Sequence, residues 1–106
     1  MKTKAKEKDI ESDIVKYAKT RGVLSYKFVS PNTRGVPDRI FLFDGRAMFM
    51  EVKRAVGGVV SHQQETQIQF LNQAGCPAYV VSSVDAGTIF IDSFIDNYWP
   101  GCVPGK

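Results

Sequence analysis

The dipeptide Asp44-Gly45 constrains the fold of this chain more than any other short stretch. It stands between two mainly apolar runs, residues 38–43 and 46–53. An Asp-Gly pair in this setting predicts a two-residue hairpin turn, because both central positions of such a turn need a positive φ angle. A chain that turns here must pair the two runs as antiparallel neighbours in a sheet.

This turn also predicts which residues face each other across the hairpin. Phe43 faces Arg46 beside the turn. The same count places Asp38 opposite Glu51, and facing side chains project to one side of a sheet. Lys53 shares that side with Glu51, because side chains alternate along a strand. We therefore expect two carboxylates and an ammonium group to meet at the far end of the hairpin.

Two facing carboxylates repel each other, and buried charge is costly unless it is paired or holds a metal. Mg²⁺ fits such a pair, because it takes oxygen ligands and tolerates one or two protein carboxylates. Zinc is disfavoured, because it prefers His and Cys, and Cys76 and Cys102 lack metal-ligand spacing. The alternative is a structural ion pair of Lys53 with either acid. The predicted register and the charge distribution favour the metal site.

Charge is distributed unevenly along the 106 residues. Residues 1–54 hold 13 Lys and Arg against 7 Asp and Glu, whereas residues 55–106 hold one Lys and four acids. A basic half favours a polyanionic partner such as nucleic acid, although a solvated basic surface would look the same. No apolar run reaches the roughly 18 residues of a membrane span. With two cysteines and no secretory signal, we expect reduced thiols and a cytoplasmic location, the host cytoplasm if a phage encodes the chain.

The rest of the chain shows helical and strand patterns in an order typical of an α/β fold. Ile10, Ile14 and Ala18 recur at helical spacing. Strands with two apolar faces, flanked by helices, indicate a mixed sheet covered on both sides. The expected helices are residues 9–21, 62–74 and, from an ambiguous pattern, 84–97; the expected strands are residues 23–29, 38–43, 46–53 and 77–82.

The domain organisation follows from this order. We expect one domain over residues 9–97, a flexible basic tail over residues 1–8, and an irregular tail over residues 98–106. Tyr98 and Trp99 in the second tail are expected to pack on the core or on a partner subunit.

An ordered set of motifs resembles the VRR-NUC family of the PD-(D/E)xK nuclease superfamily. The set consists of GVPD at residues 35–38, a hairpin, EVK at residues 51–53, and VSHQQ at residues 60–64, where the family has L-S-P-x-Q. His62 replaces the usual proline and Val60 the usual leucine.

Residue by residue, Asp38 matches the motif aspartate, and Glu51 and Lys53 match the E-x-K pair. Gln64 matches the motif glutamine, and Glu11 matches the acid on the first helix. The resemblance implies a restriction-endonuclease-like core and hydrolysis of DNA phosphodiesters with Mg²⁺ or Mn²⁺. Stand-alone phage-type members resemble Holliday-junction resolvases, which are homodimers that cut branched DNA.

Three of these residues are expected to act directly at the metal and the phosphate. Asp38 and Glu51 are expected as metal ligands, with the Val52 carbonyl as a ligand that the family implies. Lys53 would orient or activate the attacking water, or stabilise charge on the phosphate.

Two further catalytic assignments leave an alternative open. Glu11 can also be a solvated helix acid, and Gln64 can also belong to a capping box with Ser61. Phosphate contacts are expected from four basic residues, of which Arg39 faces away from Asp38: Lys27, Arg34, Arg39 and Arg54.

Three other functions fit parts of the sequence. A restriction-type, sequence-specific endonuclease would need extra elements to read bases, and 106 residues leave little room for them. A non-catalytic DNA-binding module would gain nothing from two acids aimed at phosphates. A small interaction domain would use the hairpin acids only for ion pairs.

Overall fold

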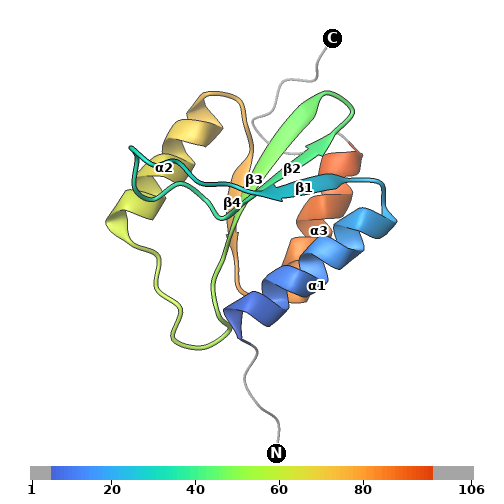
Figure 1. Cartoon of the computed structure of the whole chain (residues 1–106), viewed down its shortest axis with the longest axis horizontal. Coiled ribbons are helices and arrows are strands. Elements are labelled where there is room, and N and C mark those ends of the chain that lie inside the picture. The colour runs from blue at the N-terminus through green and yellow to red at the C-terminus, as the bar shows by residue number, and fades with distance from the viewer. Residues whose placement is uncertain (1–5, 97–106) are drawn as a thin grey trace, which may run out of the picture.

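The computed structural model describes residues 6–96, which form three helices and four strands (Figure 1). The expectations for residues 1–5 and 98–106, with Tyr98 and Trp99, lie outside this range. The elements are, in order, α1 (Glu7–Thr20), β1 (Leu24–Lys27), β2 (Arg39–Phe43), β3 (Arg46–Val52), α2 (His62–Gln73), β4 (Ala78–Val81) and α3 (Val84–Ile95).

All seven predicted elements are present among the described residues, and the α/β class is confirmed. The largest differences lie at their ends. α1 begins at Glu7, so Glu7 and Lys8 are helical and do not belong to the predicted flexible tail. The ambiguous segment after residue 83 is a helix, because the Ser83 side chain accepts a hydrogen bond from Ala86 N and caps its first turn.

The sheet has the strand order β1-β2-β3-β4 and is mixed, as predicted. β2 pairs antiparallel with both β1 and β3, and β3 pairs parallel with β4. Phe43 pairs with Arg46, which confirms the predicted register. Asp44 and Gly45 have φ angles of 52° and 76°, the positive values that a primed two-residue turn needs.

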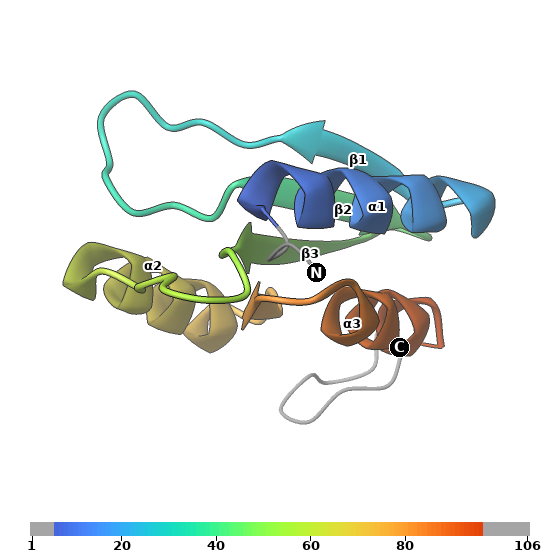
Figure 2. The same cartoon turned by 90° about the horizontal axis from the view of Figure 1, so that it is seen from below.

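One face of the sheet carries the main core beneath α1 and α3, which contact each other (Figures 1 and 2). The two helices approach closely at Gly87, where an added Cβ would lie 2.3 Å from Ile14 Cδ1. Alternate residues of β2, β3 and β4 point into this core. Its fully buried members include Ile10, Ile14, Phe41, Met48, Met50, Val52, Val81, Ile91 and Phe94.

The other face is covered only in part, which corrects the expectation of a sheet covered on both sides. α2 packs against β4, and the Asn72 side chain hydrogen-bonds to the backbone of Ala78. Phe28, from the loop after β1, packs on Phe49 with ring centroids 5.1 Å apart. Leu24 and Tyr26, on the same face at the β1 edge, are 52% and 54% exposed. Alternating apolar residues indicate burial, but they do not say what covers them.

No helix within residues 6–96 is both long enough and apolar enough to cross a membrane.

Candidate active site

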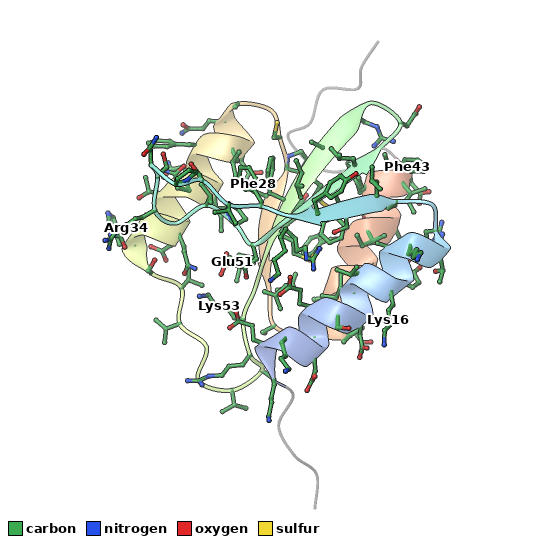
Figure 3. The ribbon with its side chains drawn as sticks, in the orientation of Figure 1. Lys16, Phe28, Arg34, Phe43, Glu51 and Lys53 are labelled. Atoms are coloured by element: carbon green, nitrogen blue, oxygen red, sulfur yellow. The ribbon has the colours of Figure 1, made fainter. Side chains whose placement is uncertain are left out.

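The predicted group of charges lies at the end of the hairpin away from its turn. Asp38 directly precedes β2, and Glu51 and Lys53 stand at the end of β3, beside each other in Figure 3. Arg39 pairs with Met50, so Asp38 and Glu51 are the next facing positions and share a side of the sheet. The Phe28 N–H donates a 2.8 Å hydrogen bond to the Asp38 carbonyl, which continues the pairing of β1 with β2.

Glu51 is a buried carboxylate, with 2% of its surface exposed. Its Oε2 accepts a 2.8 Å hydrogen bond from Gln64 Nε2 and lies 3.4 Å from Lys53 Nζ. Its other oxygen, Oε1, and Asp38 Oδ2 are buried without a hydrogen-bond partner among residues 6–96. Buried polar atoms are rarely left without a partner, so these two oxygens are suited to bind a cation or a hydrogen-bond donor.

The electrostatics of Glu51 support this interpretation. The pKa of Glu51 is raised to about 7, mainly by burial and then by the neighbouring charge of Asp38, while Lys53 acts in the opposite direction. The charge of Glu7 also raises this pKa. Without a bound cation, burial and the neighbouring carboxylate therefore oppose the ionisation of Glu51 near neutral pH.

Gln64 forms the capping box at the start of α2 and also contacts Glu51. Its backbone N–H donates to Ser61 Oγ at 3.1 Å, and its Oε1 accepts from Ser61 N at 2.9 Å, so the capping box at the start of α2 is complete. Its Nε2 is then free to donate to Glu51. One side chain thus fixes the start of α2 and ties it to the end of β3.

The loop that carries Asp38 is held against the same end of α2. Gly35 has a φ of +89°, and an added Cβ would lie 2.5 Å from both the carbonyl carbon and the oxygen of Gln63. Only glycine permits this approach of two backbones at this φ. The glycine of the GVPD motif therefore helps to position both Asp38 and Gln64.

Glu11 does not join this group. It lies on the side of β2 that faces α1, where its Oε2 accepts a hydrogen bond from Arg39 Nε at 2.6 Å and lies 3.4 Å from Lys27 Nζ. The first-helix acid whose charge acts on Glu51 is Glu7, one turn earlier. Glu7 stands four residues before Glu11 and therefore on the same side of the helix. This spacing is the sequence feature that could have identified Glu7. The catalytic role of Glu11 stays a prediction that these contacts do not support.

The four residues expected to contact phosphate are spread around the site. Arg54 follows Lys53 in the loop after β3, and its NH2 donates to the Gly57 carbonyl at 3.3 Å. Arg34 lies beside the start of α2, away from Glu51 (Figure 3). Lys27 and Arg39 lie on the opposite side of the sheet, in contact with Glu11.

Comparisons with known proteins bear on this arrangement. No model of a known protein family matches the chain. A solved structure described as "VRR_NUC domain" superposes with a TM-score of 0.73 at 23% identity, over 90% of this chain and 99% of the other. A "VRR_NUC domain protein" gives 0.75 at 16% identity, over 94% and 97%.

A closer relative in sequence is "Putative nuclease p44" from Acyrthosiphon pisum secondary endosymbiont phage 1. It is 36% identical over 85 residues, which cover 79% of this chain and 90% of the relative. The chain belongs to the VRR-NUC family of nucleases. In this VRR-NUC protein the fold brings the family-matched residues Asp38, Glu51, Lys53 and Gln64 to one end of the sheet.

The packing of Gly35 can be tested by substitution. We expect Gly35→Ala to lower the free energy of unfolding by about 1–3 kcal/mol through overpacking against Gln63, and to shift the NMR signals of the Gln64 side-chain amide. Gly75→Ala is the matched control, because Gly75 has a similar φ of +91° but open space where its Cβ would stand. Equal destabilisation by both substitutions, with Gln64 unmoved, would contradict the positioning role of Gly35.

The raised pKa of Glu51 predicts a pH dependence of stability. Between the ordinary value of 4.5 and about 7 the folded protein binds more protons than the unfolded chain. Stability without divalent cations should therefore fall as pH rises through this window, by about 1–3 kcal/mol. Urea unfolding across the window measures it.

Two variants sharpen the pH experiment. Glu51→Gln, which stays neutral, should abolish this fall, and Glu65→Gln, which removes an exposed acid of α2, should preserve it. Parallel stability curves for the wild type and Glu51→Gln would show that Glu51 titrates normally.

Proposed function

We propose that this VRR-NUC protein is a metal-dependent, structure-selective DNA endonuclease that hydrolyses phosphodiester bonds in branched DNA such as Holliday junctions. The observation that carries the proposal is the pair of buried oxygens, Asp38 Oδ2 and Glu51 Oε1, that have no hydrogen-bond partner among residues 6–96. They stand beside the ammonium group of Lys53, in a family of nucleases.

The donor set fits a hard divalent cation. The described residues contain no group of three or more His, Cys, Asp or Glu side chains that could hold a metal. Mg²⁺ needs no such group, because it keeps waters and substrate phosphate oxygens in its other positions. Bound by Asp38, Glu51 and the Val52 carbonyl, Mg²⁺ or Mn²⁺ would polarise the phosphate and lower the pKa of the attacking water.

The neighbouring side chains have distinct roles in this proposal. Gln64 and Lys53 both engage Oε2 of Glu51, which leaves Oε1 for the cation. Lys53 also orients the attacking water and stabilises the negative charge that builds on the phosphate. Gln64 is a positioning residue, because its contact is with the carboxylate of Glu51.

Branched DNA is favoured as substrate by several features together. Basic residues of the first half of the chain supply phosphate contacts, which bind a DNA shape without reading its sequence. The phage relative is named "Putative nuclease p44", and the resemblance to the VRR-NUC family implies a likeness to junction resolvases. A non-catalytic binding module is disfavoured, because two carboxylates that each keep one buried oxygen without a hydrogen-bond partner among residues 6–96 would repel phosphates.

Symmetrical cutting of a four-way junction needs two like sites, so we propose a homodimer. The part of the sheet face that α2 leaves open presents Leu24 and Tyr26, each more than half exposed. Burying such side chains against a second copy is favourable by about 1.5–3 kcal/mol each.

The nuclease proposal predicts how one substitution changes cleavage. We expect the protein to cut a labelled four-way junction in Mg²⁺ or Mn²⁺, to cut linear duplex less, and to be inactive in EDTA. Asp38→Ala should lower the rate by at least about a hundredfold, because it removes a ligand of the activating cation. Gel analysis of the labelled products measures both.

The matched control is Asp44→Asn, which removes an exposed acid at the other end of the same hairpin and should retain activity. Binding without cutting in either metal would leave a DNA-binding module. Cutting at one base sequence in linear duplex would instead assign a restriction-type enzyme.

The dimer can be tested separately from catalysis. Sedimentation equilibrium should give twice the monomer mass of 11.8 kDa, and the double variant Leu24→Glu/Tyr26→Glu should give the monomer mass. Ile89→Glu, at an exposed apolar residue of α3 that is 62% accessible, should leave the dimer intact. A monomeric wild type at micromolar concentration would refute this part of the proposal.

A further inference from the structure

A second concave site lies on the side of the sheet away from Asp38 and Glu51. A pocket of about 300 Å³ opens between α1 and the ends of β1 and β2. Its polar lining consists of Lys8, Glu11, Ser12, Lys16, Lys27 and Arg39. The role of Glu11 that the candidate active site leaves unexplained belongs to this pocket.

The pocket is strongly basic. Four cationic side chains line it against the single carboxylate of Glu11, a net charge of +3. Neither Lys8 nor Lys16 forms an ion pair within residues 6–96, whereas Lys27 and Arg39 both approach Glu11 Oε2. Like charges gathered around one cavity repel each other, so an anion bound there would be stabilised.

Glu11 acts as a support for Arg39 within this pocket. It is 8% exposed and engages the Nε atom of the guanidinium at 2.6 Å. Arg39 NH1 lies 3.5 Å from Ser25 Oγ. A guanidinium has five N–H donors, so the contacts with Glu11 and Ser25 leave other N–H groups of Arg39 able to bind a phosphate. A carboxylate that fixes a guanidinium in this way orients it and keeps the surrounding charge positive.

The position of the pocket relates it to the candidate active site. Arg39 directly follows Asp38, and their side chains lie on opposite sides of β2. Lys27 is the last residue of β1 and Arg39 is the first of β2, so the pocket opens at the same end of the sheet as the acids. One DNA molecule that crosses this end can reach both sites, but a single phosphate cannot.

We propose that this pocket binds a backbone phosphate of the DNA substrate other than the one that is cut, and so sets how the DNA crosses the end of the sheet. The inference rests on the proposed nuclease function. It assigns Lys8, Lys16, Lys27 and Arg39 to the contact with this phosphate, and Glu11 to the positioning of Arg39.

The test measures DNA binding in EDTA, where cutting does not occur. Fluorescence anisotropy with a labelled duplex, across a series of salt concentrations, compares the wild type with Lys8→Gln/Lys16→Gln and with Lys19→Gln. Both lysines of the double variant are exposed, so it should fold as the wild type does. Lys19 is an exposed lysine of α1 outside the pocket and serves as the matched control.

We expect the double variant to bind more weakly and to lower the slope of log affinity against log salt by about 1–2, because each lost phosphate contact contributes roughly 0.9. Lys19→Gln should keep the affinity and slope of the wild type. Equal affinity and slope for the wild type and the double variant would overturn the pocket assignment alone, and the cleavage assay would still decide the nuclease proposal.

Two other outcomes also bear on the assignment. A deficit that appears only on duplexes with phosphorylated ends would assign the pocket to a terminal phosphate and overturn the backbone contact. A wild-type protein that binds neither the duplex nor a four-way junction at low salt would overturn both this inference and the proposed function.

Discussion

The turn at Asp44 and Gly45 is the constraint on which the rest of the structure depends. Its positive φ angles fix the register of β2 against β3, and that register places Asp38 opposite Glu51. The resulting repulsion opposes the hairpin that creates it, and burial together with the charge of Asp38 raises the pKa of Glu51 to about 7. Lys53 and Gln64 offset this cost through one oxygen of Glu51 only. Two buried carboxylate oxygens therefore lack hydrogen-bond partners, among residues 6–96, at the site where we propose that hydrolysis occurs.

The remaining parts of the site come from segments that are distant in sequence. Gly35 lets the loop before β2 rest on the backbone of Gln63, and the capping box holds Gln64 with its amide directed to Glu51. α2 has no fully buried residue, so these contacts at its first turn do much to fix its position. A helix that contributes little to the core thus serves to hold one carboxylate in place.

The features that could be predicted from the sequence are those that depend on residues close together in the chain. The register of the hairpin followed from one turn, and the capping box of Ser61 and Gln64 followed from their spacing. Glu11 was different, because which turn of α1 approaches Glu51 depends on how α1 crosses α3, and Gly87 and Ile14 set that crossing through tertiary packing. The half-open sheet face was also missed, because an apolar pattern indicates burial and leaves the covering element unknown.

The parallel pairing of β3 with β4 has a consequence for how the protein folds. A hairpin closes locally within microseconds, whereas a parallel pair must wait for its crossover, here the segment that contains α2, to return along the sheet. Until this crossover has closed, the two acids meet without the amide of Gln64. Closure of this crossover therefore brings the amide of Gln64 to the carboxylate that faces Asp38 across the hairpin.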